Sequence, residues 1–244
     1  MKEEYYRWRT PYLNKNFEML VFGHAGIPVI FFPEASGHFY DAKESGLIEA
    51  ARDLIDSGGV KIYCPEVNDV NSWLSSEYPS EKLRLHHAYE RVIMQEVVKK
   101  AQFETHKHRV IFIGIAWGAY HAINTAFRHP ETAGYVFSIS GEFQIRKYLG
   151  EYFDETCYYN SPFDFINGMQ EGELLNQVRE MGVAIGTPEH HPESEQTIEL
   201  SRILTNKKVP HWLDIHRGEY NHWGLWKQMF VNYLTIAVEK GVSK

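Results

Sequence analysis

The chain has few cysteines, no excess of basic residues and no long uncharged apolar run. Cys64 and Cys157 are the only two cysteines in 244 residues, too few for a disulfide framework. With 25 basic and 32 acidic residues the net charge is -7, which argues against a nucleic-acid partner. No stretch is long enough to span a bilayer, and the start, "MKEEYYRWRT", does not resemble a signal peptide. We therefore expect a cytoplasmic protein without a membrane or nucleic-acid partner.

Short apolar runs alternate with amphipathic segments along the chain. The runs "IPVIFFP", "VKIYCP" and "RVIFIG" are typical of strands buried on both faces. The N-terminal segments 4–13 and 16–23 predict an antiparallel hairpin, and 80–101 predicts a long helix with Ser80 as its N-cap. This order predicts an α/β fold with a mostly parallel sheet and helices on both faces. No linker or repeat interrupts it, so we expect one domain over 1–244.

The segment "GIAWGAYHA", residues 114–122, follows a predicted strand and opens a predicted helix. Its spacing is that of a nucleophile elbow, G-x-S-x-G, in which glycines allow a sharp turn between strand and helix. The central residue, however, is Ala116. An alanine has no atom that can attack a carbonyl carbon.

Together with this elbow, four segments resemble the esterase family of α/β-hydrolases that is similar to esterase D and the antigen 85 mycolyltransferases. They are "YYRWRTPYLNKNFEMLVFGHAGIPVIFFPEASGHFYD", "GIAWGAYHAINTAFRHPE", "YFDETCYYNSP" and "VPHWLDIHRGEYNHWGLWKQM". The resemblance covers nearly the whole chain. It implies the α/β-hydrolase fold, a Ser-Asp-His triad that hydrolyses small esters or thioesters, and no cofactor.

Carried over residue by residue, the resemblance implies that the triad is incomplete. Ala116 stands at the nucleophile position. The acid falls on Glu189 by its spacing from the preceding strand, and a longer loop would place it at Glu193 or Glu195. The family histidine stands two residues before a tryptophan, and that position is Asn221 here. The nearest histidine, His222, follows it by one residue.

The oxyanion hole depends on backbone N–H groups, which survive side-chain substitution. The resemblance assigns one donor to Trp117, after the nucleophile position, and the other to Ala35 or Ser36 in "PEASGHF". Glu34 and His38 lie on the same loop, as pocket residues or as ordinary loop residues. Such a pocket can bind an ester, acyl or carboxylate ligand without acyl transfer.

Thirteen histidines invite comparison with metal sites. No H-x₃-H or C-x₂-C spacing is present, and His190 and His191 are typical of a solvated loop, so we expect no metal. His121 is expected to be a packed, hydrogen-bonded side chain.

Three functions fit these observations. The leading hypothesis is a non-catalytic esterase homologue that binds a small ligand, a protein partner or a second copy of itself. The alternative is a serine carboxylesterase or thioesterase in a form inactivated by alanine at position 116. A third is an enzyme in which His222 or Glu34 activates water directly.

Overall fold

A computed structural model describes residues 1–218 and 222–241, with His222 described by its backbone only. Eight strands form one sheet in the order β1-β2-β4-β3-β5-β6-β7-β8. The pairs β1–β2 and β2–β4 are antiparallel, and all other pairs are parallel. The strands are β1 Glu3–Thr10, β2 Lys15–Phe22, β3 Ile27–Phe32, β4 Val60–Pro65, β5 Val110–Ile115, β6 Ala133–Ile139, β7 Gly182–Pro188 and β8 Trp212–His216. The predicted α/β sheet with its N-terminal hairpin is confirmed.

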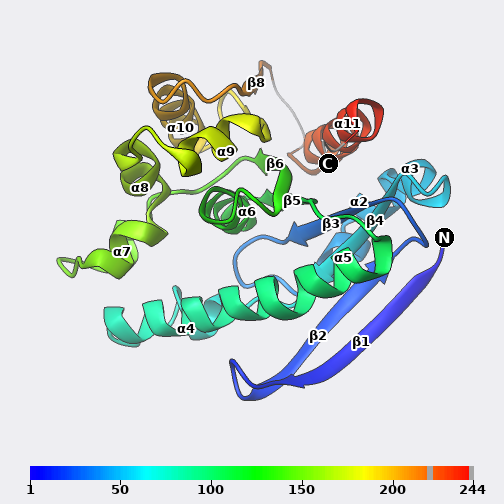
Figure 1. The fold of residues 1–244 in the computed structure, drawn as a ribbon, viewed down its shortest axis with the longest axis horizontal. Helices are drawn as coiled ribbons and strands as arrows, with labels where there is room; N and C mark the ends of the chain where they lie inside the picture. Colours follow the sequence, from blue (N-terminus) through cyan, green and yellow to red (C-terminus); the bar gives the residue numbers. More distant parts are fainter. Residues whose placement is uncertain (219–221, 242–244) are drawn as a thin grey trace.

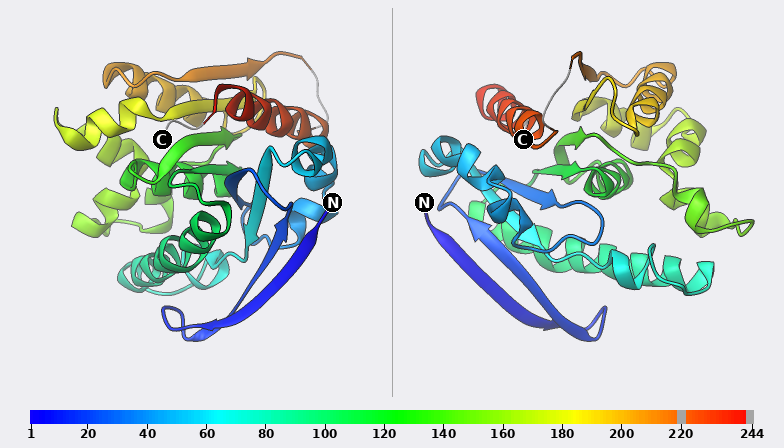
Figure 2. Two further views of the ribbon diagram at one scale, coloured as in Figure 1. Left: turned by 45° about the vertical axis from the view of Figure 1, so that its right-hand side comes forward. Right: turned by 180° about the vertical axis from the view of Figure 1, so that it is seen from behind.

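Helices cover both faces of the sheet (Figures 1 and 2). One face carries the long continuous helix from α4 to α5, together with α6 and the helices α8–α10. The other face carries α1–α3 and α11. The helices are α1 Asp41–Glu44, α2 Leu47–Ala50, α3 Arg52–Asp56, α4 Pro79–Val92, α5 Lys99–Thr105, α6 Trp117–Arg128, α7 Glu155–Asn160, α8 Pro162–Gly168, α9 Glu173–Glu180, α10 Ser194–Asn206 and α11 His222–Lys240. Among the described residues, no helix is long and apolar enough to cross a membrane.

Side chains of the central strands alternate between the two faces, so the molecule has two cores. On β3, Ile30 and Phe32 pack under α6, whereas Val29 and Phe31 pack under α11. Because both faces are covered by helices, both sets must be apolar. This is the physical reason for the uninterrupted apolar runs in the sequence.

The helix predicted over 80–101 is present, but its start differs from the prediction. The N-cap position is Tyr78 and Pro79 is the first helical residue, so Ser80 lies inside the helix. Proline is favoured there because its fixed φ suits a first turn that needs no N–H donor. The helix also continues through a π-helical turn, Ile93–Val98, into α5.

The start of α6 lies unusually close to the end of β3. A Cβ atom built on Gly118 would stand 2.1 Å from the carbonyl oxygen of Phe32 and 2.3 Å from that of Pro33. A Cβ atom built on Gly114 would stand 2.0 Å from the carbonyl oxygen of Gly118. Both elbow glycines are therefore required by backbone-to-backbone contact.

We predict that Gly118→Ala destabilises the protein by about 3 kcal/mol, because backbone atoms cannot move aside as a side-chain tip can. Urea denaturation followed by circular dichroism measures this. Gly172→Ala is the matched control, since no atom lies within 4 Å of the position that its new methyl group would take. Equal stabilities of the two variants would contradict the close approach.

A buried carboxylate joins α4, α6 and α7. Glu90 accepts hydrogen bonds from Arg128 (2.7 Å) and His129 (3.0 Å). Arg128 also donates to the side-chain oxygen of Asn160 (2.8 Å), at the end of α7. Burial alone would raise the pKa of Glu90, but hydrogen bonds from His129 and His87 and the charge of Arg128 outweigh it and hold the pKa well below its ordinary value. The carboxylate thus fixes α7 against the main body.

The sign of the pH dependence follows from this lowered pKa. Glu90 contributes stability above the pKa it has in the unfolded chain, near 4.3, and that contribution disappears as the pH falls further. We predict that Glu90→Gln lowers the unfolding free energy at pH 7 by about 3 kcal/mol, because Arg128 loses its charge partner. Between pH 5 and pH 3 the variant should lose less additional stability than the parent.

Urea denaturation at pH 7, 5, 4 and 3 tests this. Glu199→Gln, which breaks only an exposed pair with Arg202, serves as control. Parallel pH profiles of the parent and Glu90→Gln would contradict the assignment.

Candidate functional site

The turn between β5 and α6 has the backbone of a nucleophile elbow. Ala116 has φ 50° and ψ -113°, a conformation that L-residues rarely adopt and that costs on the order of 1–3 kcal/mol. Its N–H donates to the carbonyl oxygen of Ile139 (2.9 Å), and its own carbonyl accepts from the N–H of Glu142 (3.2 Å). The end of β6 therefore holds the strained residue in place.

The loop after β3 lies beside this turn because of the close contact at Gly118. It carries Glu34, Ala35 and Ser36, and Ser36 also has a positive φ of 59°. The N–H of Gly37 donates to the carbonyl oxygen of Glu34 (3.0 Å), which closes a tight turn. In the described part of the chain, the N–H groups of Ala35, Ser36 and Trp117 donate to no backbone carbonyl.

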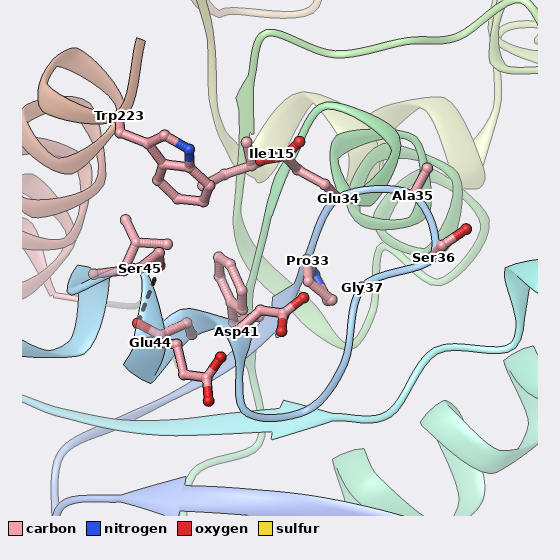
Figure 3. Close-up of a pocket in the computed structure, with 13 residues that line it drawn as sticks. Pro33, Glu34, Ala35, Ser36, Gly37, Asp41, Glu44, Ser45, Ile115 and Trp223 are labelled. Atoms are coloured by element: carbon pink, nitrogen blue, oxygen red, sulfur yellow. Dashed lines mark hydrogen bonds between the residues drawn. The ribbon is translucent and has the colours of Figure 1, made fainter. Parts of the chain in front are cut away.

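A cavity of about 360 Å³ opens between this loop, the elbow and the start of α11 (Figure 3). Its apolar walls come from Phe31, Leu47, Ile115 and Trp223. Its polar lining includes Glu34, together with residues of the loop and of α1. The polar and small lining residues are Pro33, Glu34, Ala35, Ser36, Gly37, Asp41, Ala42, Glu44 and Ser45.

Of the four loop residues that the sequence assigns to the pocket, three line this cavity and one does not. Glu34, Ala35 and Ser36 are lining residues. The imidazole of His38 instead pairs with Glu66 (Nδ1 to Oε1, 2.9 Å) and stacks on the ring of Tyr40. Burial, and secondarily the charge of Asp41, raise the pKa of Glu34 above its ordinary value.

The acid candidates follow β7, with Glu189 directly after the strand, Glu193 at the N-cap position of α10 and Glu195 in the first turn of that helix. The N–H of Glu189 donates to the carbonyl oxygen of His216, while its carboxylate is 43% exposed and 4.0 Å from the Arg217 guanidinium. Glu193 and Glu195 line a separate hollow with Gln144. The Glu193 carboxylate accepts a hydrogen bond from Gln196.

Of the two histidine-position candidates, Asn221 lies outside the described residues. His222 is the first residue of α11, so only its backbone position is described.

The start of α11 is anchored by a contact that the sequence did not predict. The indole N–H of Trp226 donates to the hydroxyl of Ser140 (2.9 Å), a fully buried residue at the end of β6 with a φ of 51°. The His191 ring packs against the same indole, with 6.1 Å between ring centroids. In the sequence His191 is one of two adjacent histidines in a polar loop, and nothing in that pattern distinguishes it.

Two histidine–aspartate pairs lie outside this cavity. His121, on the elbow helix, contacts Asp69 at 2.8 Å with both side chains buried, as expected of a packed histidine. His216 contacts Asp214 at 3.1 Å, and Asp214 accepts a further hydrogen bond from Tyr233. Among the residues that the structure describes, no group of three histidine, cysteine or acidic side chains is arranged to hold a metal ion.

Comparison with known proteins places this geometry in a family. Residues 24–235 match the family described as "Putative esterase". A search of curated proteins found no match.

Solved structures with the same fold span almost the whole chain. A ferulic acid esterase superposes with a TM-score of 0.77 at 15% identity over 98% of both chains. S-formylglutathione hydrolase (FrmB) of Staphylococcus aureus gives 0.70 at 14% over 97% of both, and MPT51 (FbpC1) of Mycobacterium tuberculosis gives 0.68 at 14% over 98% of both. At these identities the structural likeness establishes the fold alone. The family is shown by the sequence match, which covers residues 24–235. The chain belongs to this esterase family of α/β-hydrolases.

Proposed function

We propose that this chain is a non-catalytic member of the family whose pocket binds a small ester-like ligand without cleaving it. The observation that carries the proposal is Ala116, a residue without a nucleophilic atom in the strained backbone of a nucleophile elbow. The two cysteines are unpaired and buried, which suits the cytoplasmic location that we propose from the sequence.

The remaining machinery suits binding better than acyl transfer. The N–H groups of Trp117 and of Ala35 or Ser36 are available to a ligand carbonyl, as in an oxyanion hole. The positive end of the α6 dipole also favours a carbonyl oxygen near Trp117. A cavity of about 360 Å³ falls within the range of small-molecule sites.

The residues at the histidine and acid positions also favour the interpretation that the whole catalytic triad has been lost. Asn221 carries an amide, which cannot accept the proton of a nucleophile. The Glu189 side chain is 43% exposed, and its carboxylate lies near Arg217. In a serine triad, loss of the serine alone costs about 10⁶ in turnover, and further losses add little. The backbone donors and binding contribute about 10³ to 10⁴ over water.

The alternative, a serine esterase inactivated only at position 116, predicts a different response to one substitution. We expect that neither the parent nor Ala116→Ser hydrolyses 4-nitrophenyl acetate with a burst, because a serine without its base is not activated. Steady-state release of 4-nitrophenol, pre-steady-state traces and labelling by a fluorophosphonate measure this directly.

Circular dichroism and thermal unfolding of Ala116→Ser serve as the folding control. A gain of several orders of magnitude with serine, accompanied by fluorophosphonate labelling, would show that a general base is in place and would contradict the non-catalytic proposal. Turnover by the parent without a burst and without labelling would instead favour direct activation of water by His222 or Glu34.

A further inference from the structure

We take as given the proposed function of the cavity between the β3–α1 loop, the elbow and the start of α11. The distribution of charges around this pocket then indicates which class of ligand it binds. Three carboxylates line it, those of Glu34, Asp41 and Glu44, and no lysine or arginine is among its described lining residues. Lys227 of α11 approaches Gly46, between α1 and α2, and is not part of the lining. An anionic ligand would therefore meet charges of its own sign.

Glu34 differs from the other two carboxylates because its charge is partly buried and has no compensating group. Asp41 accepts a hydrogen bond from the N–H of His38 (2.9 Å), and Glu44 is exposed to water. Glu34 is half-buried, and in the described part of the chain its carboxylate has no hydrogen bond or ion pair. Removing a carboxylate from water without a partner is unfavourable, so a cation placed beside it would be stabilised.

The surroundings of Glu34 suit an organic cation better than a metal ion. In Figure 3 its side chain extends from the β3–α1 loop toward Ile115 and Trp223, with Asp41 and Glu44 on the other side of the pocket. Trp223, which is 37% exposed, supplies aromatic surface in the same cavity, and the buried Phe31 also contributes to the lining. Aromatic faces attract alkylammonium groups, whereas a divalent metal ion needs several oxygen ligands close together.

Hydrogen-bond donors lie close to this pocket, and one of them, the N–H of Ala35, belongs to a lining residue. The N–H groups of Ala35 and Trp117 come from the two segments that Gly118 holds in contact. A ligand that carries a carbonyl oxygen and a cationic group would therefore find donors for the first and Glu34 for the second.

We infer that the ligand of this pocket is a carbonyl compound with a positively charged alkylammonium group, and that Glu34 recognises that group. The inference rests on the proposed function, because it concerns the same pocket. Glu34 acts here as a specificity-determining residue and takes no part in bond making.

Two probes of matched shape test the inference. Acetylcholine carries the cation, and 3,3-dimethylbutyl acetate has carbon in place of nitrogen and is neutral. We expect the parent protein to bind acetylcholine at least about tenfold more tightly, by isothermal titration calorimetry or by NMR titration. Added salt should reduce this preference, because Glu34 is only partly buried.

Glu34→Gln keeps the shape of the side chain and removes its charge. It should abolish the preference for acetylcholine while leaving the affinity for the neutral ester within about twofold. Glu81→Gln is the control, because Glu81 is an exposed residue of α4 that pairs with Arg84. It should leave both affinities unchanged.

The outcomes separate the two proposals. Equal binding of both probes, or a preference that survives Glu34→Gln, would overturn the ligand class and leave the proposed binding function standing. If neither probe binds or shifts an NMR signal of the pocket at millimolar concentration, the ligand class and the proposed binding function both fail. If the parent cleaves both esters, the pocket binds esters but the non-catalytic proposal fails.

Discussion

The site depends on one contact, in which the first turn of α6 lies directly on the carbonyl groups that end β3. This contact is set by the absence of a side chain at Gly118, and it brings the elbow and the β3–α1 loop together. Without it, the turn that carries Trp117 and the loop that lines the cavity would lie farther apart. The strand order places β3 and β5 next to each other, so the two segments already meet at one edge of the sheet. Crevices beyond the carboxyl ends of parallel strands are where ligands of α/β proteins bind.

Three of the residues around that edge have backbone conformations that glycine would adopt more easily. Ser36, Ala116 and Ser140 all have positive φ angles, and they follow β3, β5 and β6 respectively. The last two are held by hydrogen bonds between neighbouring strand ends: Ala116 donates to Ile139, and Ser140 donates to Gly186 (2.7 Å). Strained backbone of this kind persists only where the surrounding structure determines it. At this edge the strain is therefore a property of the backbone framework and does not depend on which side chain stands at position 116.

The sequence was sufficient for the fold because the information lies in local patterns. Apolar runs on β3, β4 and β5 indicate strands covered on both faces, and the glycine spacing at 114 and 118 indicates a sharp strand-to-helix turn. The prediction of Ser80 as the N-cap was wrong because the helix already begins at Pro79, with Tyr78 at the N-cap position. Contacts between distant segments, such as Ser140 with Trp226 or His191 with Trp226, leave no periodic signal in the chain. Which residues of the loop after β3 line the cavity could not be read from the sequence, because the orientation of His38 toward Glu66 depends on a residue that follows another strand.

The exchange of serine for alanine at an elbow removes one oxygen atom and little else. Alanine fills almost the same volume, and the hydrogen bonds that hold position 116 are made by the backbone alone. The geometry that would stabilise a developing oxyanion can therefore remain as a carbonyl-binding site after the attacking atom is gone. Under the proposed function, binding and bond cleavage separate in this fold: the first would depend on backbone atoms fixed by Gly118 and the strand ends, and the second on side chains. In that proposal, a carboxylate such as Glu34 would set ligand choice without having to preserve a catalytic geometry.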